Sequence, residues 1–259
     1  MNRREFWDRC LQVYDGLNQL DDYRECMETA ARELEIRPGL RVLDAGSGTG
    51  NFSMLLRTRN VDVVSLDFSP VAIRIHKQKD PEAVTVQASL EDPLPFDDAS
   101  FDRIACLSVL FTISPQGARL ALSEFRRILR PGGLLVLTAM MPGHSKLRGF
   151  CSHVAKRIRV AGRRNILGEF KASIFPVAKM LYYNIRMYAL RRQHGYRRFT
   201  QSELIEETRR AGFADLRWRL TYGGRFLMVV GHAPQDDLWH PDAGVAARAA
   251  VHPLALSGA

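Results

Sequence analysis

The sequence is poor in the features that mark secreted, disulfide-bonded or membrane-spanning proteins. It has four cysteines among 259 residues, and none of them shows paired spacing. We therefore expect reduced thiols and no metal site. No apolar run approaches the roughly 20 residues of a membrane span, and the N-terminus MNRREFWDRC lacks an apolar signal-peptide core. These absences favour a cytoplasmic protein, and a peripheral association with a membrane stays open.

Acidic residues are almost missing from one segment, residues 144–198. It holds fourteen Lys or Arg and a single acid, Glu169, whereas the rest of the chain holds 23 basic and 27 acidic residues. All of the excess charge of +9 therefore lies in this segment. An apolar stripe at helical spacing runs through its second half, at Ile174, Ala178, Leu181, Ile185 and Tyr188. We predict a basic, helical cap over residues 141–199.

Elsewhere the pattern predicts alternating helices and short apolar strands. Strands are predicted at 41–46, 61–69, 83–89, 101–111, 134–140, 216–222 and 225–233, and helices at 5–20, 23–35, 51–57, 71–79, 121–130 and from about 202. This alternation predicts an α/β fold with a doubly wound, mostly parallel, seven-stranded Rossmann-like sheet. Gly223-Gly224 between the last two strands predicts an antiparallel C-terminal hairpin. Thr200 and Glu203 predict a capping box at the start of the helix that precedes this hairpin.

The stretch RVLDAGSGTGNFS places three glycines at alternate positions, Gly46, Gly48 and Gly50, between a strand and a helix. Asp67 ends the next strand, where a carboxylate can bind ribose hydroxyls. A dehydrogenase would have Gly-x-Gly-x-x-Gly spacing and a helix N-terminus directed at a pyrophosphate. Here Asp44 precedes the turn, and its charge would repel a phosphate. The pattern therefore favours a nucleoside cofactor that lacks phosphates and carries a positive charge.

Together with three later segments, this stretch gives the chain a resemblance to the class I S-adenosylmethionine-dependent methyltransferases over roughly residues 40–140. The segments are LDFSPVAI, SLEDPLPFDDASFDRI and ILRPGGLLVL. The chain is similar to ubiquinone/menaquinone-type methyltransferases and to synthases of 3-hydroxy fatty acid methyl esters. The resemblance implies S-adenosylmethionine as cofactor and these binding residues: Asp44, Gly46, Ser47, Gly48, Gly50, Asn51, Asp67, Phe68, Ser69, Ser89, Leu90 and Leu107. Related enzymes usually carry an acid at the position of Ser89.

We divide the chain into three parts on this basis. Residues 1–37 are predicted to be an N-terminal helical lid, and residues 38–233 the methyltransferase domain with its basic cap. Residues 234–259, rich in Ala, Pro, His and Asp, are predicted to be a loosely ordered tail. A monomer and a homodimer both stay open.

The acceptor is expected beyond the C-terminal ends of the strands. Ser108 and Thr112 follow strand four there, and His144 follows strand five. The candidate catalytic residues are His144, as a general base, and Tyr14, which could close over the site; a surface histidine and a lid aromatic are the plainer interpretations. The remaining helical and loop histidines are predicted to lie at the surface: His76, His153 and His194.

Three classes of acceptor fit the basic cap. The first is a hydrophobic acyl, carboxyl, quinone-precursor or polyketide-like substrate, delivered by an acidic carrier protein or an anionic membrane. The residues predicted to dock the substrate or carrier are Tyr182, Arg186, Arg191 and Arg192. The second is RNA or another nucleic acid, although CLSVLF lacks the Asn/Asp-Pro-Pro-aromatic signature of base-amino methyltransferases. The third is a protein that binds the cofactor without catalysis.

Overall fold

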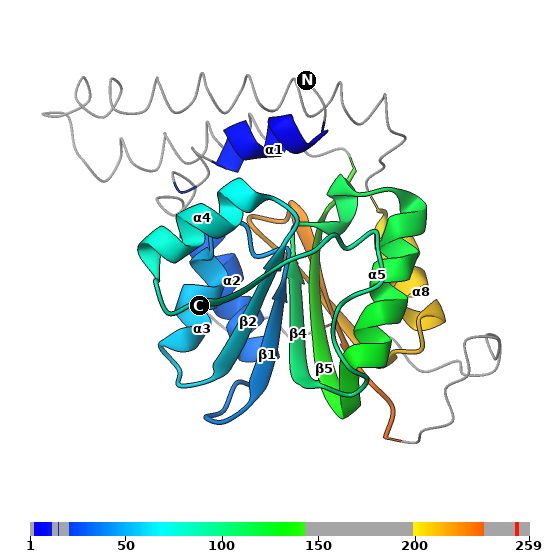
Figure 1. Ribbon diagram of the computed structural model, residues 1–259. Helices are drawn as coiled ribbons and strands as arrows, with labels where there is room; N and C mark the ends of the chain where they lie inside the picture. The colour runs from blue at the N-terminus through cyan, green and yellow to red at the C-terminus, as the bar shows by residue number, and fades with distance from the viewer. Residues whose placement is uncertain (1–2, 12–14, 16–20, 143–198, 236–251, 254–259) are drawn as a thin grey trace, which may run out of the picture.

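The computed structural model describes residues 3–11, 15, 21–142, 199–235 and 252–253, which build a single sheet flanked by helices (Figure 1). The strand order is β3-β2-β1-β4-β5-β7-β6-β8. The strands are β1 (Arg41–Ala45), β2 (Asp62–Asp67), β3 (Val84–Gln87), β4 (Phe101–Leu107), β5 (Leu129–Met140), β6 (Ala214–Thr221), β7 (Phe226–His232) and β8 (His252–Pro253).

The sheet confirms the predicted topology. Strands β1 to β5 run parallel to one another, and β7 is antiparallel to both β5 and β6. The predicted C-terminal hairpin is therefore present, with Gly223 and Gly224 both at positive φ. The short β8, which belongs to the predicted tail, pairs in parallel with β6 and adds an eighth strand at the edge.

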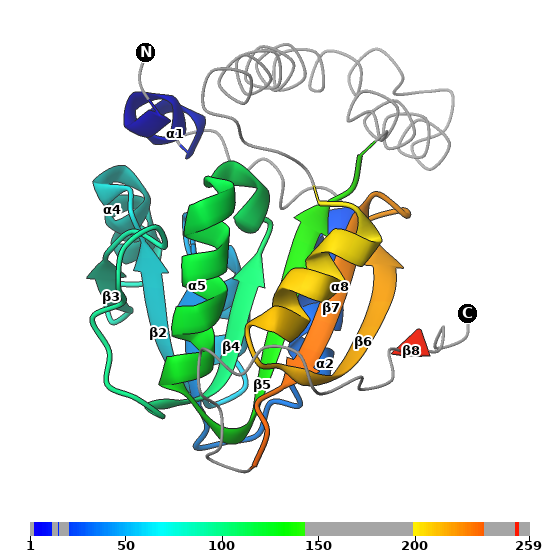
Figure 2. The same cartoon turned by 90° about the vertical axis from the view of Figure 1, so that its right-hand side faces the viewer.

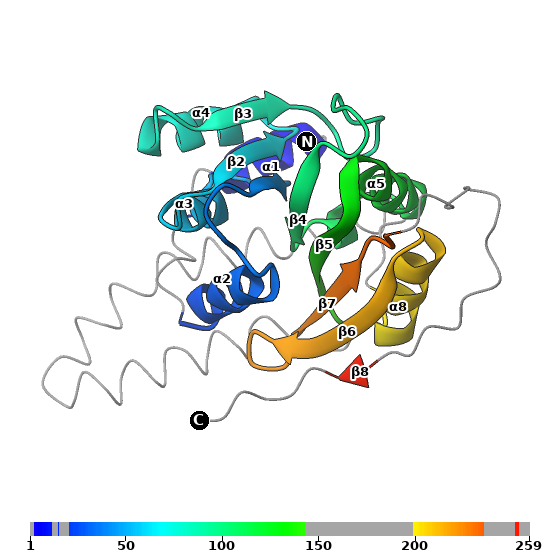
Figure 3. The same ribbon diagram turned by 90° about the horizontal axis from the view of Figure 1, so that it is seen from below.

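Helices cover both faces of the sheet. They are α1 (Arg3–Leu11), α2 (Asp21–Glu33), α3 (Asn51–Arg57), α4 (Pro70–Lys79), α5 (Pro115–Ile128) and α8 (Gln201–Arg210). Seen along the strands, α2 and α3 lie on one face and α5 and α8 on the other (Figure 3). Helix α1 lies above the carboxyl ends of the parallel strands (Figure 2). Within the described residues, no helix has the length and hydropathy needed to cross a bilayer.

The core explains why the strands read as continuous apolar runs. Neighbouring residues of β1 point to opposite sides, so that Val42 packs in the cluster of α2 and α3 while Leu43 packs in the cluster of α5 and α8. Both side chains are fully buried. A parallel sheet covered on both faces needs such two-sided burial, and the strand ends are thereby held in fixed register for the site above them.

Some predicted boundaries are wrong for local reasons. The helix predicted at 121–130 begins earlier, at Pro115, because the Ser114 hydroxyl accepts a hydrogen bond from the Gly117 backbone N–H (3.0 Å) and caps it. The following strand starts at Leu129 rather than at residue 134. The strand predicted at 101–111 ends at Leu107 because the chain turns into a short 3₁₀ helix, Leu110–Thr112. Of the helix predicted at 5–20, the structure describes α1 and residue 15.

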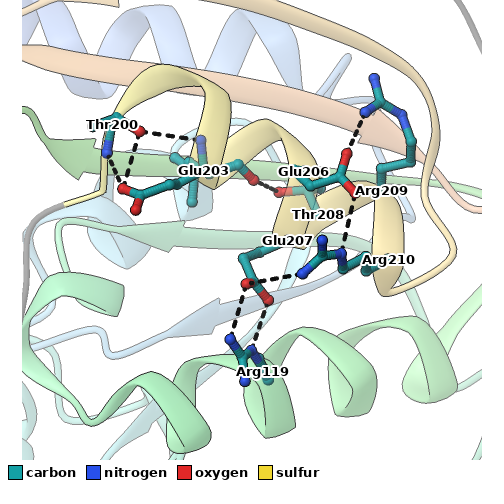
Figure 4. Close-up of polar contacts among 9 residues, drawn as sticks. Arg119, Thr200, Glu203, Glu206, Glu207, Thr208, Arg209 and Arg210 are labelled. Carbon is teal, nitrogen blue, oxygen red and sulfur yellow. Dashed lines mark hydrogen bonds and ion pairs between the residues drawn. The ribbon is translucent and has the colours of Figure 1, made fainter.

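The predicted capping box at the start of α8 is confirmed (Figure 4). The Thr200 hydroxyl accepts from the Glu203 backbone N–H (3.2 Å), and the Glu203 carboxylate accepts from the Thr200 backbone N–H (2.8 Å). Further along the helix, Glu207 receives two hydrogen bonds from the Arg119 guanidinium of α5, at 2.9 and 3.2 Å. Helix α8, which follows the predicted cap in the sequence, is therefore capped at its start and bonded to α5.

The variant Thr200→Ala should lower the free energy of unfolding by about 1 kcal/mol, because it removes the side-chain half of the box. Chemical denaturation followed by circular dichroism measures this change. Gln201→Ala, one residue further along, keeps the cap and is the matched control. Equal stability of Thr200→Ala and the wild type would show that the cap contributes nothing.

Candidate active site

The glycine turn lies across the carboxyl end of β2. The backbone N–H groups of Gly46 and Ser47 both donate to the Leu66 carbonyl, at 2.7 and 2.9 Å. Gly46, Gly48 and Gly50 have φ values of 79°, 55° and 81°, which favour glycine. A Cβ on Gly46 would stand 2.4 Å from a methyl carbon of Val109. The turn is therefore held by both backbone conformation and close packing.

Asp67 joins this turn to the end of β2. Its carboxylate accepts hydrogen bonds from the Gly48 backbone N–H (2.8 Å) and from the Ser69 backbone N–H (2.9 Å). Ser69 in turn caps α4 by accepting from the Ala72 backbone N–H (3.1 Å). Burial raises the pKa of Asp67, and these backbone hydrogen bonds oppose the rise. Asp67 also lines a pocket, and its carboxylate holds the glycine turn and the start of α4 together.

Asp44 is a second buried carboxylate, one strand away. It accepts a hydrogen bond of 2.5 Å from the Ser53 hydroxyl, which is itself bonded to the Ser65 hydroxyl (2.8 Å). Burial raises its pKa from 3.8 to about 7; Ser53 opposes the rise and the charge of Asp67 adds to it. A positively charged ligand would relieve this crowding of acids, and a phosphate would aggravate it.

One pocket gathers most of the residues predicted to bind the cofactor. Those lining it are Asp44, Gly46, Ser47, Gly48, Asp67, Phe68, Ser89, Leu90 and Leu107. The other three lie next to it in sequence and structure: Gly50 is the N-cap of α3, Asn51 begins that helix, and Ser69 caps α4. The structure thus brings the predicted set together, and each residue's role in binding stays a prediction.

The same pocket has residues that sequence reasoning missed. They are Trp7 and Leu11 of α1, Tyr23, Cys26 and Met27 of α2, Phe52 of α3, and Tyr222 of the hairpin, among others. Tyr23, Cys26 and Met27 recur at i, i+3 and i+4, which places them on one helix face. This spacing is the feature of the sequence from which the pocket-facing side of α2 could have been predicted. Ser108 and Thr112, which were expected near the acceptor, also line the pocket.

His76 corrects the prediction of a surface histidine. It is fully buried, because α4 turns His76 and Ala72, one helical turn apart, toward the protein interior. A Cβ on Gly50 would lie 2.1 Å from the His76 ring. Neither ring nitrogen has a hydrogen-bond partner among the described residues. Burial lowers the pKa of His76, so the imidazole supports the glycine turn as a neutral ring.

Several predicted residues lie outside the described residues. They are the candidate catalytic residues Tyr14 and His144, the docking residues Tyr182, Arg186, Arg191 and Arg192, and His153 and His194. Their roles stay predictions.

The N-terminal segment is attached to both cofactor loops. Asp8 of α1 accepts a hydrogen bond from the Ser69 hydroxyl, beyond the end of β2. Asp15 accepts from the Thr49 hydroxyl in the glycine turn (2.5 Å) and pairs with Lys79 of α4 (3.1 Å). Residues of the predicted lid thus contact both loops, and the movement of the lid stays a prediction.

The site suits a nucleoside that carries positive charge. A ribose would meet the acid at the end of β2, and a charged ammonium or sulfonium would meet the buried acids instead of a phosphate-binding helix. The fold and this site are those of the class I S-adenosylmethionine-dependent methyltransferases, and S-adenosylmethionine is the cofactor that the site suits. Residues 43–137 match the family described as methyltransferase domain.

Curated relatives share this domain to different extents. The chain is 28% identical over 222 residues to a demethylmenaquinone methyltransferase of Streptomyces avermitilis, covering 84% of this chain and 88% of that protein. It is 40% identical over 126 residues to a malonyl-[acyl-carrier protein] O-methyltransferase of Erwinia pyrifoliae, covering 48% of this chain and 46% of that protein. The chain therefore spans about half the length of the second relative.

Solved structures support the fold. A methyltransferase of Haloferax volcanii, in complex with the activator Trm112, aligns with a TM-score of 0.61 and 17% identity, covering 91% of this chain and 99% of that one. A methyltransferase of Aquifex aeolicus aligns with a TM-score of 0.57 and 14% identity, covering 90% and 99%. At such identities the likeness concerns the fold.

Proposed function

We propose that the protein methylates a carboxylate oxygen of a hydrophobic acyl substrate, giving a methyl ester. The observation that carries this proposal is the lining of the pocket away from Asp67. There, the lining includes apolar residues such as Met27 and Leu107 and the hydroxyl-bearing residues Ser108, Tyr23 and Tyr222. An acyl chain suits the apolar surface, and a carboxylate suits the hydroxyl donors.

The chemistry of these donors favours an acceptor that is already deprotonated. When bound, the cofactor supplies a methyl group on a positively charged sulfur, which a nucleophile takes up by displacement. A carboxylate is ionised near neutral pH and needs no base. Burial raises the pKa of both Tyr23 and Tyr222, so both phenols stay protonated and can donate hydrogen bonds. Burial also raises the pKa of Cys26 to about 11, which keeps it a neutral thiol.

An acidic carrier protein is the proposed source of the substrate. The Erwinia relative acts, by its name, on malonyl-[acyl-carrier protein]. Residues 144–198 of this chain hold fourteen basic residues and one acid, a charge that would steer an acidic partner toward the site. The docking roles of Tyr182, Arg186, Arg191 and Arg192 belong to this proposal.

A quinone precursor is the second candidate acceptor. It is supported by the aromatic pair Tyr23 and Tyr222, whose ring centroids lie 6.4 Å apart at an interplanar angle of 73° and could stack with a planar ring. The Streptomyces relative is named for such a substrate.

One experiment separates these candidates. The protein is incubated with methyl-labelled S-adenosylmethionine and, in separate reactions, decanoic acid, malonyl-loaded acyl carrier protein, a prenylated naphthohydroquinone and bacterial RNA. We expect label in one of the two acyl reactions, released as volatile methanol by mild alkali because methyl esters hydrolyse. Alkali-stable label on the naphthohydroquinone would overturn the proposal in favour of the second candidate, and label on RNA would overturn both.

A further inference from the structure

Two residues other than glycine line the pocket with a left-handed backbone. Ser108 has φ 65° and Tyr222 has φ 56°. Such a conformation costs a side-chain-bearing residue of the order of 1 kcal/mol or more and persists where the surroundings hold it, often at functional sites. Ser108 is held at the end of β4 by its backbone N–H, which donates to the hydroxyl (2.9 Å) and carbonyl (3.0 Å) of Thr138.

Tyr222 is held by Arg225 in the hairpin between β6 and β7. The Arg225 guanidinium donates to the Tyr222 carbonyl (2.8 Å) and lies over the Tyr222 ring, 5.0 Å from its centroid. The same guanidinium pairs with Asp22 at the start of α2. A single arginine therefore fixes the tyrosine and ties the hairpin to a helix from the other end of the chain.

Two further contacts join α2 to the hairpin. The Tyr23 ring meets the Tyr222 ring edge-on, and the Cys26 thiol lies 3.6 Å from the Thr221 hydroxyl. The hairpin stands at the carboxyl edge of the parallel strands, because Met140 at the end of β5 pairs with Phe226 at the start of β7. The Tyr222 side chain is thus presented where an acceptor is expected.

The pocket accordingly has two chemically different halves. The acids Asp44 and Asp67 lie on β1 and β2, on one side of the point between β1 and β4 where the strand order reverses. Ser108 follows β4, and Tyr222 follows β6 beyond β5 and β7, so both lie on the other side. A cofactor held by the first half would face an acceptor held by the second.

We infer that Tyr222 is an acceptor-binding residue and that Arg225, with Asp22, is the group that positions it. The phenol donates a hydrogen bond to the acceptor oxygen, and the ring packs against the apolar part of the acceptor. The identity of the acceptor rests on the proposed function, whereas the place of Tyr222 rests on the contacts above.

The test compares variants of the full chain with decanoate as acceptor. Tyr222→Phe, which keeps the ring, should raise KM for decanoate about tenfold, as expected for a lost hydrogen bond to a charged group. Tyr222→Ala should raise it further. Arg225→Met should act in the same direction, and Arg225→Lys should recover part of the loss because it keeps the charge toward Asp22. In all four variants the affinity for S-adenosylmethionine, measured by calorimetry, should stay within about twofold of the wild type.

Leu220→Ala is the matched control, because Leu220 is a 47% exposed residue of the same strand end. Wild-type KM values in both Tyr222 variants would overturn the inference. Parallel losses of kcat and cofactor affinity would also overturn it, since they indicate a structural role. Binding of the fluorescent fatty acid cis-parinaric acid gives a readout independent of turnover. If decanoate is not methylated but parinarate binding still weakens in Tyr222→Phe, the proposed function is wrong and the assignment of Tyr222 as an acceptor-binding residue is supported.

Discussion

The Asp44→Asn variant should bind S-adenosylmethionine up to about 100-fold more weakly than the wild type. Asp44 is a buried carboxylate that lines the pocket, and S-adenosylmethionine carries positive charge on its ammonium and sulfonium groups. Losing a charge-assisted hydrogen bond at a buried site costs up to about 3 kcal/mol, which corresponds to this fold-change. Calorimetric titration measures it, with Leu220→Ala, an exposed residue outside the pocket, as the control. Equal affinities of Asp44→Asn and the wild type would remove Asp44 from the binding site.

The same variant should be more stable than the wild type in the absence of ligand. The pKa of Asp44 is raised from 3.8 to about 7, chiefly by burial. A carboxyl group whose pKa is raised on folding stabilises the fold while protonated, and that contribution disappears as the pH rises from about 4 through about 7. Above about pH 8 the ionised group costs at most about 4 kcal/mol, which neutral asparagine avoids.

The raised pKa of Asp44 predicts how both the stability and the cofactor affinity change with pH. Between about pH 4 and pH 7 the unliganded wild type should lose stability relative to Asp44→Asn. Its affinity for the cofactor should instead fall as the pH drops below about 7, because protonated Asp44 no longer attracts the positive charge. Thermal unfolding and calorimetry at several pH values measure the two trends. Parallel curves for the two proteins would contradict the assignment of the pH effect to Asp44.

Gly50→Ala should lower the free energy of unfolding by about 3 kcal/mol, through backbone strain at φ 81° and a clash with the buried His76 ring 2.1 Å away. Gly48→Ala is the matched control. Its φ is 55° and the nearest atom to its added Cβ belongs to Leu11 at 3.5 Å, so about 1 kcal/mol of strain is expected. Chemical denaturation measures both changes.

A double-mutant cycle isolates the clash at Gly50. His76→Ala should cost less stability in the Gly50→Ala background than in the wild type, because it removes the colliding ring. Additive effects of the two substitutions would show that strain in the backbone alone accounts for the loss.

The gathering of the predicted cofactor residues in one pocket could be predicted because they are close in sequence to strand ends. Asp44 and Asp67 lie at the ends of two consecutive strands and the glycine turn follows the first, and parallel strands bring such ends to one edge of a sheet. The part of the pocket proposed for the acceptor depends on tertiary contacts. Tyr23 and Tyr222 meet only because β7 inserts between β5 and β6 and α2 packs beside the hairpin, and neither residue belongs to a motif.

Two predictions made from local sequence patterns were wrong: the surface position of His76 and the extension of β4 beyond Leu107. The residues around His76 are mostly polar, which suggested an exposed helix, but its neighbour in space is a glycine and leaves room for the ring. At β4 the apolar run continues past Leu107, so a strand was predicted where Ser108 turns the backbone. In both places packing between elements outweighs the local sequence pattern.

The position of β7 between β5 and β6 also has consequences during synthesis. Strands β1 to β5 and the loops after β1 and β2 are synthesised well before β7, which begins at Phe226 and pairs with β5. Until then β5 has an open edge able to pair with other chains, which exposes the nascent polypeptide to aggregation. The strands that carry Asp44 and Asp67 are thus synthesised before the hairpin that carries Tyr222.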